Sequence, residues 1–578
     1  MNPQPQILIL DAGGQYCHLI ARKVRDLGVY AEVRASETPA GQLSSAKGLI
    51  ISGGPSSVYD SGSPTVDPAL FTRGPAVLGI CYGHQLMAHL LGGDVRKGEK
   101  GEFGLATLEM DVTNDPLFSG LAGRQQVWMS HRDLVAGVPQ GFSIAGRTET
   151  CPIAAIANPA RQLYAVQFHP EVVHTTRGKE VLANFVFRVC GCEKDWDARH
   201  RAPLVEQEIR ACTGARNVFF FVSGGVDSTV AFALCTRALG ENRVRGVYVD
   251  TGLMREGETD FVRRMPGISV ECAQEQFLNA LAGVTDPEQK RHIIGEEFVR
   301  VQERVIDSRR LVDENWILGQ GTIYPDTIES GGTAKAALIK THHNRVAGIQ
   351  KLIECGRIVE PLKSFYKDEV REIGRELGLP AELLDRHPFP GPGLAIRCLC
   401  SEFDAEVRPT PEGWVIPVHS VGVQGDSRSY APVLAIRELD HARATELINH
   451  LSGVNRVIAL VNGRAPLTGM QVRACSLTPE RLARLRAADA TVRRLSHESG
   501  FDHQVWQFPV VLIPLGTEEA PDSVVLRPIH SVDGMTAQSV TMEAPLLDRM
   551  SKELLTHQGI AAIFFDLTHK PPATIEWE

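Results

Sequence analysis

Short apolar segments that recur between helical stretches are the feature that most restricts the fold of this chain. Four of them, each ending in small or polar residues, are Ile7–Leu10, Gly48–Ile51, Ala76–Ile80 and Tyr164–Phe168. Continuous apolar runs of this length are typical of strands buried on both faces of a sheet, with helical segments covering them. The first 195 residues are therefore predicted to form an α/β domain.

A second set of such segments follows a polar stretch, which we interpret as a linker or a connecting helix. The predicted strands of this second α/β domain, placed at residues 200–397, are Asn217–Val222, Arg245–Asp250 and Trp316–Gly319. The domain ends near His387–Gly393, because three prolines and two glycines exclude a regular helix there.

The last third, residues 398–578, contains a weak internal repeat. Pro417–Gly422 is echoed by Pro528–Asp533, and a helical stretch and an apolar strand follow each copy. This pattern predicts a C-terminal α+β region built from two related subdomains, at about 414–515 and 522–578.

Length and charge limit the class of protein. A chain of 578 residues is expected to hold three or four domains. Its 60 Lys and Arg against 69 Asp and Glu give a net charge of −9, which disfavours nucleic acid and anionic membranes as partners. No apolar run approaches the roughly 18 residues that span a bilayer. Twelve scattered cysteines fit a reducing compartment, so we expect a cytoplasmic protein.

Cys81 lies between glycines directly after a predicted strand, in Gly79-Ile-Cys-Tyr-Gly83. Small neighbours permit a sharp turn from strand to helix, and the helix that follows directs its positive end at the sulfur. That environment favours the reactive thiolate, although a buried structural cysteine would show the same short pattern.

A partner for Cys81 occurs after a later strand, in Gln167-Phe-His-Pro-Glu171. His169 can accept the thiol proton, and Glu171 can orient the imidazole and stabilise its cation. The predicted catalytic residues are therefore Cys81, His169 and Glu171.

The turn Ser52–Pro55 also follows a predicted strand, and its glycines let a backbone N–H point at a developing oxyanion. Gly54 and the amide of Tyr82 are the predicted donors. Together these motifs resemble the class I, triad-type glutamine amidotransferases, and the resemblance implies hydrolysis of glutamine to glutamate and ammonia. Arg132 departs from that family, which usually has Ser-His-Gly-Asp where this chain has Ser-His-Arg-Asp.

The loop Ser223-Gly-Gly-Val-Asp-Ser228 joins a predicted strand to a predicted helix. Successive small residues at such a junction form a nest of backbone N–H groups suited to phosphate, although a capped tight turn would use similar residues. The loop lacks the Gly-Lys-Ser/Thr of γ-phosphoryl transfer enzymes.

This loop resembles the signature of the N-type ATP pyrophosphatases, in which ATP loses pyrophosphate and the substrate becomes adenylated. The resemblance implies ATP contacts from Ser223, Gly224, Gly225, Val226, Asp227 and Ser228. Asp250, at the end of the next strand, can reach the ribose or a metal, or can cap the following turn. Lys340 is a plausible mobile cation for the ATP phosphates, although a single lysine is usually a solvated surface residue. Mg²⁺ is the expected cofactor, with metal ligands unknown.

Further motifs in all three regions resemble the GMP synthase family. They are Asp286–Arg291, Gly319–Asp326, Ile339–Asn344, Arg386–Arg397 and the terminal Lys570–Glu578. The resemblance covers essentially the whole chain. It implies ATP-dependent amination of XMP to GMP through an adenyl-XMP intermediate, with ammonia taken from glutamine.

The resemblance also implies which residues contact XMP. They are Arg291, Asp426, Gln507, Lys570 and Glu576. A structural turn at Asp426 and a stiff tail at Lys570 are the alternatives. The chain resembles the longer family form with a duplicated C-terminal unit, so we expect either a monomer with an intramolecular pseudo-dimer or a homodimer.

Two other functions are considered. One is another ammonia- or glutamine-using ATP pyrophosphatase, such as an NAD synthetase-like ligase. The other is a regulatory nucleotide-binding protein with degenerate catalytic domains, which the intact Cys81 and His169 disfavour. The pairs Cys190/Cys192 and Cys398/Cys400 lack the Cys-x₂-Cys spacing of most zinc sites. The arginine-bearing stretch Arg481–Arg494 is expected to be a solvated amphipathic helix face and not a nucleic-acid site.

Overall fold

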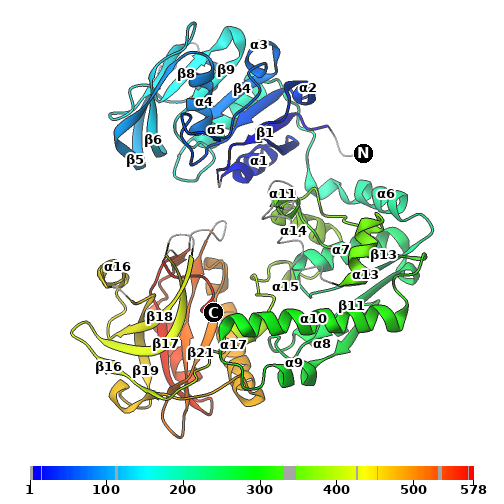
Figure 1. Ribbon diagram of the computed structural model, residues 1–578, viewed down its shortest axis with the longest axis vertical. Helices are drawn as coiled ribbons and strands as arrows, with labels where there is room; N and C mark the ends of the chain where they lie inside the picture. The colour runs from blue at the N-terminus through cyan, green and yellow to red at the C-terminus, as the bar shows by residue number, and fades with distance from the viewer. Residues whose placement is uncertain are drawn as a thin grey trace. The chain divides into compact units, whose positions relative to one another are not determined.

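The computed structural model describes residues 4–14, 16–110, 115–329, 346–424, 427–451, 453–531, 537–570 and 572–578 (Figure 1). The chain divides into two compact units, which we call unit 1 and unit 2. Unit 1 comprises Met1–Val205, Ile323–Ala337 and Lys363–Ile373, and unit 2 comprises Glu206–Thr322, Leu338–Leu362 and Gly374–Glu578. The division at residues 1–195, 200–397 and 398–578 stays a prediction, since the second and third of these regions cluster as one unit.

Unit 1 contains a nine-stranded sheet in the order β2-β1-β3-β4-β9-β8-β7-β5-β6. Its first five strands run parallel: β2 (Ala31–Ala35), β1 (Ile7–Asp11), β3 (Gly48–Ile51), β4 (Ala76–Ile80) and β9 (Leu163–Val166). The other four are antiparallel: β8 (Ala155–Asn158), β7 (Ser143–Arg147), β5 (Asp94–Met110) and β6 (Arg124–Gly137). The predicted α/β fold is confirmed.

Alternate residues of β1 explain why its sequence is continuously apolar. Ile7 and Ile9 belong to the hydrophobic core on one face of the sheet, whereas Leu8 and Leu10 belong to the core on the other face. Side chains of successive strand residues point to opposite faces, so a strand covered on both sides needs apolar residues at every position. The covering helices include α1 (Cys17–Arg25), α4 (Tyr82–Leu90) and α5 (Gly178–Ala183).

Two later segments complete unit 1, namely α11 (Tyr324–Glu329) and most of α14 (Lys367–Glu376). Side chains from these later segments and from the first part of unit 1 together enclose the buried guanidinium of Arg25. The guanidinium forms a 3.0 Å ion pair with Glu369. Four aromatic rings lie 4.8–5.0 Å from its Cζ atom, those of Tyr30, Trp196, Tyr324 and Tyr366. A buried cation requires such a charged partner and ring faces to offset its desolvation.

Unit 2 begins with a five-stranded parallel sheet in the order β12-β11-β10-β13-β14. The strands are β10 (Asn217–Phe221), β11 (Val244–Asp250), β12 (Ile268–Cys272), β13 (Trp316–Gly319) and β14 (Ile358–Val359). The chain passes from β10 outward to β12 and then returns to place β13 on the other side of β10. The carboxyl ends of β10 and β13 therefore form a topological switch point, where open α/β sheets bind ligands.

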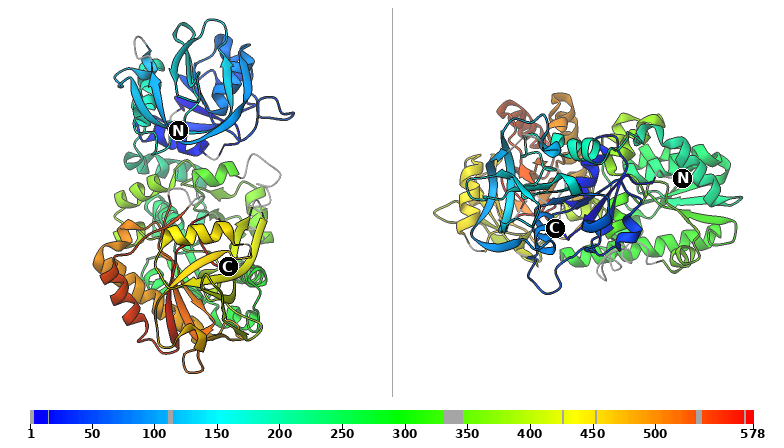
Figure 2. Two further views of the ribbon diagram at one scale, coloured as in Figure 1. Left: turned by 90° about the vertical axis from the view of Figure 1, so that its left-hand side faces the viewer. Right: turned by 90° about the horizontal axis from the view of Figure 1, so that it is seen from above.

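The C-terminal part of unit 2 is a seven-stranded sheet in the order β16-β17-β18-β19-β26-β23-β21 (Figures 1 and 2). The strands are β16 (Arg408–Pro409), β17 (Trp414–Gln424), β18 (Ser427–Ile436), β19 (Arg456–Gly463), β21 (Val510–Ile513), β23 (Asp522–Leu526) and β26 (Ile560–Asp566). Helices α16 (His441–His450) and α18 (Ala544–Leu554) precede β19 and β26 respectively.

The two halves of this sheet have related topology. In one half the antiparallel pair β17–β18 leads through α16 to β19, which runs parallel to β18. In the other half the antiparallel pair β21–β23 leads through α18 to β26, which runs parallel to β23. The two halves meet at the antiparallel pair β19–β26. The second half thus includes β21, which precedes residue 522, the predicted start of the second subdomain.

The sequence echo marks different places in the two halves. Pro417–Gly422 lies within β17, the first strand of its hairpin, whereas Pro528 follows β23, the second strand of its hairpin. The match between the two motifs is therefore not a match of equivalent strands. The corresponding helices and final strands, α16 and β19 with α18 and β26, do follow the predicted order.

Helix α17 (Pro479–Ser499) contains the arginine-bearing stretch, and its arginines have protein partners. Arg481 is only 7% exposed and forms a 2.8 Å ion pair with Asp522. Arg486 donates to the backbone carbonyls of Gly252 and Met254. The expectation of a solvated helix face was therefore wrong in part, since several of these side chains bind other elements of unit 2. In the part of the chain that the structure describes, no helix is long and apolar enough to cross a membrane.

Candidate active sites

Three adjacent parallel strands of unit 1, β3, β4 and β9, deliver the predicted glutaminase residues to one edge of the sheet. Ser52–Gly54 follows β3, Cys81 follows β4 and His169 comes shortly after β9. The carboxyl ends of neighbouring parallel strands share an edge, so residues far apart in the sequence meet there. A Cβ atom built on Gly53 would lie 3.5 Å from Cys81 Cβ and 3.0 Å from His169 Cε1.

Cys81 has the backbone of a nucleophile elbow. Its φ of 52° and ψ of −104° lie outside the regions that residues with a side chain usually adopt. Gly79 and Gly83 permit this turn, because a Cβ atom on Gly79 would lie 2.5 Å from Gly83 O and one on Gly83 would lie 2.4 Å from Ile51 O. Such local strain is typical of functional residues held by a surrounding fold.

The predicted base and its orienting carboxylate are in contact. His169 Nδ1 lies 2.7 Å from Glu171 Oε1, and both side chains are buried. Burial lowers the pKa of His169. The charge of Glu171 and the hydrogen bond to Cys81 raise this pKa by more than burial lowers it, so the net pKa is well above its ordinary value. The arrangement favours the imidazolium form of His169 beside the sulfur of Cys81.

Two polar contacts of Cys81 have no counterpart in the predicted site. The Ser130 carbonyl oxygen lies 3.6 Å from Cys81 Sγ, and Gln167 Nε2 lies 3.7 Å from the same sulfur. Ser130 directly precedes His131, and Gln167 lies two residues before His169, so their positions in these motifs were the available signal. Gly54 packs against the loop after β1. A Cβ atom built on Gly54 would lie 2.3 Å from Ala12 O, so no side chain fits there.

In unit 2 the predicted phosphate loop joins β10 to α7 (Val226–Leu239), at the switch point of the five-stranded sheet. Ser223 Oγ lies 3.0 Å from Ser228 Oγ and accepts a 3.3 Å hydrogen bond from the amide of Gly225. Gly224 has a φ of +77°, which favours glycine. The loop thus closes on itself at a helix N-terminus, where backbone N–H groups and the helix dipole attract anions.

The segment after β13 packs directly on this loop. A Cβ atom on Gly321 would lie 2.8 Å from Ser228 N and 2.9 Å from Asp227 C. Asp250, buried at the end of β11, accepts hydrogen bonds from the amide of Gly252 at 3.1 Å and from Gln274 Nε2 at 2.8 Å. Asp250 therefore caps the following turn, and a ribose or metal contact stays a prediction.

Three of the predicted XMP contacts gather near the C-terminus. Gln507 Nε2 lies 3.4 Å from Glu576 Oε1, and Arg291 donates to the backbone carbonyl of Glu578. Lys570 pairs its backbone with Ala537. Lys340 and Asp426 lie outside the residues that the structure describes.

Arg397 and Arg255 are buried cations near this tail that the sequence did not single out. Arg397 binds Glu576 through two hydrogen bonds, of 2.9 and 2.7 Å. Burial raises the pKa of Glu576, but the charges of Arg397, and to a smaller extent of Arg255 and Arg291, lower it to a net value below the ordinary one. In the described part of the chain, Nε of Arg291 and Nη1 of Arg397 are buried without a hydrogen-bond partner.

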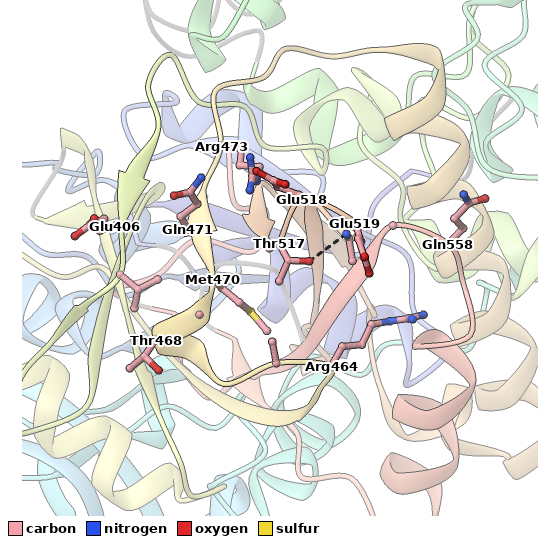
Figure 3. A pocket seen from close by; sticks show the side chains of 16 residues that line it. Glu406, Arg464, Thr468, Met470, Gln471, Arg473, Thr517, Glu518, Glu519 and Gln558 are labelled. Atoms are coloured by element: carbon pink, nitrogen blue, oxygen red, sulfur yellow. Dashed lines mark hydrogen bonds between the residues drawn. The ribbon is translucent and has the colours of Figure 1, made fainter.

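A cavity of about 1000 Å³ lies in the C-terminal part of unit 2 (Figure 3). Its lining combines both charges, with Arg464 and Arg473 beside Glu406, Glu518 and Glu519. None of the predicted site residues that the structure describes lines it. The cavity is therefore separate from both predicted reaction sites.

Neither Cys-x-Cys pair gathers a third metal-ligating side chain among the described residues. Cys400 instead faces cations, with Lys290 Nζ and Arg481 Nη1 each 3.8 Å from its sulfur. The three clustered groups found in the described residues are Glu102, His131 and Cys151, in unit 1.

The folds and these two sites define a glutamine amidotransferase combined with an ATP-pyrophosphatase-type unit. The family model for class I glutamine amidotransferase matches residues 8–189, the one for NAD synthase matches residues 199–263, and the one for the GMP synthase C-terminal domain matches residues 495–577. The NAD synthase match covers the phosphate loop, which ATP pyrophosphatases share.

Full-length relatives decide between the candidate ligases. The chain is 41% identical over 605 residues to "Probable GMP synthase [glutamine-hydrolyzing]" of Leptospira interrogans, with 99% of each chain covered. It is 40% identical to the GMP synthase of Caldicellulosiruptor saccharolyticus, again with 99% of each covered, and 41% identical to that of Carboxydothermus hydrogenoformans, also with 99% of each covered. The solved structure of a putative GMP synthase component from Thermoplasma acidophilum is 28% identical, with a TM-score of 0.29 and coverage of 33% of this chain and 96% of that one.

The chain belongs to the glutamine-hydrolysing GMP synthase family. It is therefore a ligase with glutamine amidotransferase activity, as its sequence motifs predicted.

Proposed function

We propose that Cys81, His169 and Glu171 hydrolyse glutamine in unit 1 and that the ammonia released aminates an adenylated XMP in unit 2. The observation that best supports the first half is the convergence of β3, β4 and β9, which brings Cys81 and His169 to one edge of the sheet. The second half is supported by the phosphate loop at the switch point between β10 and β13.

The glutamine half-reaction starts from the Cys81 thiolate. The sulfur attacks the side-chain amide carbon, and the backbone amides of Gly54 and Tyr82 stabilise the oxyanion. His169 then gives its proton to the leaving nitrogen, which departs as ammonia and leaves a thioester. Water, deprotonated by His169, attacks the thioester and releases glutamate, which restores the Cys81 thiolate and the protonated His169.

The synthetase half-reaction starts from XMP and ATP. The β- and γ-phosphates bind the loop Ser223–Ser228, the xanthine O2 attacks the α-phosphorus, and pyrophosphate leaves. Ammonia then displaces AMP from adenyl-XMP to give GMP. Lys340 is proposed to contact the ATP phosphates, and Asp250 the ribose.

The XMP phosphate requires cationic donors, and arginines that contact the C-terminal tail offer them. We assign XMP contacts to Arg291, Gln507, Lys570, Glu576 and Asp426. The buried N–H groups of Arg291 and Arg397 that have no partner among the described residues support an anion in this region. A buried donor is costly unless it is satisfied, so a ligand phosphate fits the donor set.

Mg²⁺ is the expected cofactor of the ATP site. Asp227 in the first turn of α7 and Asp250 at the end of β11 present carboxylate oxygens at the same edge of the sheet, and such oxygens suit this hard cation. When bound, Mg²⁺ would neutralise part of the triphosphate charge. The side chains would hold it together with phosphate oxygens.

We further propose a cytoplasmic enzyme with three functional regions, at residues 1–195, 200–397 and 398–578. The pairing of two related half-sheets through β19 and β26 supports an intramolecular pseudo-dimer in a monomeric enzyme, and a homodimer is the alternative. Light scattering distinguishes them, since an obligate dimer would contradict the monomeric assignment.

The decisive experiment measures GMP formation from XMP and Mg-ATP with glutamine or ammonium, for the wild type and Cys81→Ala. We expect the wild type to use both donors and the variant to use ammonium alone. Pyrophosphate release with another acceptor, without GMP from either nitrogen donor, would contradict the assignment of XMP as the substrate. It would still agree with the proposed ATP site.

A further inference from the structure

Glu102, His131 and Cys151 come together in unit 1 beside the glutaminase site. One ligand atom from each residue lies within 4.8 Å of the other two. They come from β5, from β6 and from the turn between β7 and β8. The pairing of β5 with β6 shifts register between Lys97 and Glu102, and this irregularity sets Glu102 directly opposite His131. Irregular strand pairing of this kind re-aims side chains near active sites.

The turn that carries Cys151 is held by reciprocal hydrogen bonds with Thr148. The Cys151 amide donates to Thr148 Oγ1 at 2.9 Å, and the Thr148 amide donates to the Cys151 carbonyl at 2.9 Å. Thr148 Oγ1 also lies 3.1 Å from Glu102 Oε1. The cysteine is fully buried, so its sulfur has a fixed position in the cluster.

Both ring nitrogens of His131 face hydrogen-bond acceptors. Nδ1 lies 2.9 Å from the carbonyl oxygen of Asp133, which can only accept, and Nε2 lies 3.1 Å from Glu102 Oε2. Burial raises the pKa of Glu102, but hydrogen bonds from His131, Thr150 and Thr148 lower it to a net value below the ordinary one. The carboxylate is thus ionised at neutral pH and also only accepts. The space between Nε2 and the Glu102 carboxylate therefore favours a cation.

The donor set matches a borderline-soft divalent ion. Imidazole nitrogen, thiolate sulfur and carboxylate oxygen are the ligands that Zn²⁺ prefers, with a water or other group in the fourth position. The donation from His131 Nδ1–H to a backbone carbonyl is the outer contact that fixes a metal-binding tautomer, and Thr148 orients the carboxylate similarly.

We propose that Glu102, His131 and Cys151 form a binding site for Zn²⁺ or a similar divalent transition-metal ion. The ion binds His131 Nε2 and a Glu102 oxygen and displaces the proton on Cys151 Sγ, so each binding event releases the thiol proton. The Glu102 carboxylate and the Cys151 thiolate together offset the charge of the divalent cation, as a buried site requires.

The thiol proton is the main obstacle to binding at neutral pH. Burial, with the charge of Glu102 second, raises the pKa of Cys151 to about 12. A metal ion must displace this proton, so the affinity rises with pH by up to ~10-fold per unit while the thiol proton is exchanged. This steep dependence separates the proposed site from surface carboxylates, which release no proton at neutral pH.

Occupancy would act on the glutamine half-reaction. Ser130, the neighbour of His131 on β6, places its carbonyl 3.6 Å from Cys81 Sγ. An ion that fixes His131 against β5 also fixes this carbonyl and the wall of the glutamine pocket. This consequence rests on the proposed role of Cys81, whereas metal binding does not.

The test uses full-length Cys81→Ala, because Cys81, His169 and Glu171 are themselves possible metal ligands. Equilibrium dialysis with ZnCl₂, and absorption spectra with CoCl₂, should give one ion per chain and a thiolate-to-cobalt charge-transfer band. Adding Cys151→Ser should abolish the band, and adding Glu102→Gln should weaken Zn²⁺ binding at least ~10-fold. The matched control, Cys192→Ser in the same background, should change neither.

Binding that survives Cys151→Ser, or that disappears with Cys192→Ser, would overturn the proposal, as would the absence of binding to Cys81→Ala. If the Cys151→Ser variant fails to fold, proton release by the Cys81→Ala parent still decides, since binding of Zn²⁺ without release of a proton at neutral pH contradicts coordination by the Cys151 thiolate.

For the consequence, Zn²⁺ should alter glutamine-dependent but not ammonium-dependent GMP formation by the wild type, and Cys151→Ser should need at least ~10-fold more Zn²⁺ for the same effect. Equal sensitivity of wild type and Cys151→Ser would place the effect elsewhere and refute the link to the pocket, while the dialysis result on the binding site would stand.

Discussion

His169 Nδ1 lies 2.7 Å from Glu171 Oε1, and the Glu171 side chain is completely enclosed. This contact fixes the ring orientation, so that Nε2 is left for the thiol of Cys81. In the proposed mechanism the carboxylate also stabilises the positive charge that the ring acquires.

Replacing Glu171 with Gln should lower glutamine-dependent GMP formation by at least ~10²-fold, because the imidazolium loses its charge partner. Ammonium-dependent formation should stay near the wild-type rate, since that reaction bypasses unit 1. Steady-state assays with each nitrogen donor measure both rates. An equal loss with ammonium would instead indicate general misfolding.

Gly83→Ala should abolish most glutaminase activity, because its Cβ would lie 2.4 Å from Ile51 O and would displace the turn that holds Cys81. Gly41→Ala is the matched control, since nothing lies within 4 Å of its Cβ. Glutamate release measured for both variants tests the elbow. Comparable losses in both would show that the turn is not responsible.

Gly321→Ala should reduce GMP formation with either nitrogen donor by at least ~10-fold, since its Cβ would lie 2.8 Å from the amide nitrogen of Ser228. Gly295→Ala in α10 (Pro287–Arg309) has open space around its Cβ and serves as the control. ATP binding measured by calorimetry should weaken in Gly321→Ala alone. Unchanged ATP affinity in that variant would argue against a phosphate role for this loop.

Unfolding of the protein should depend on pH through His84. Burial lowers the pKa of this side chain to about 3, whereas the unfolded chain protonates it near its ordinary value of 6.5. The unfolded state therefore binds more protons between these values. The contribution of neutral, buried His84 to the free energy of unfolding is present above pH 6.5. This contribution is lost as the pH falls toward 3, by up to ~1.4 kcal/mol per pH unit.

Urea unfolding followed across this pH range provides the measurement. The slope should decrease in His84→Gln and persist in His89→Gln, which changes an exposed position on the same helix. The same slope in His84→Gln as in the wild type would exclude His84 as its source.

Glu576→Gln should destabilise unit 2 by roughly 3 kcal/mol, because Arg397 would keep a buried charge without its partner. It should also weaken XMP binding. Asp548→Asn removes an exposed ion pair with Lys552 and should change stability little. Urea denaturation and XMP titration of both variants test the assignment, which fails if the two behave alike.

That the predicted catalytic residues meet at one edge of the sheet could be inferred from the sequence, because each follows a strand end. Cys81 and His169 stand beside glycines or prolines that terminate apolar runs, and parallel topology brings such positions together. The same holds for Ser223–Ser228. The local sequence patterns around these residues therefore predicted which of them lie close together in the fold.

Other parts depend on pairings that no local pattern encodes. Glu102 meets His131 only through an irregular register of two long strands, and Arg397 meets Glu576 only because the C-terminal tail returns to it. The boundaries of the two subdomains stay a prediction, since the similar motif occurs on different strands of the two hairpins. The Cys-x-Cys pairs are visible in the sequence because of their spacing. Glu102, His131 and Cys151 come from three separate elements, so no spacing marks them.

The ion pair between Arg25 and Glu369 has a consequence for biosynthesis. The two residues are 344 positions apart, and the second belongs to a segment that returns to unit 1 after much of unit 2. At ordinary translation rates the ribosome needs roughly 20–70 s to make that stretch. Throughout this interval the nascent amidotransferase unit lacks the carboxylate and two of the aromatic rings that enclose Arg25. A fragment ending at residue 205 would retain this unfinished surface permanently, so it is not equivalent to unit 1 of the intact chain.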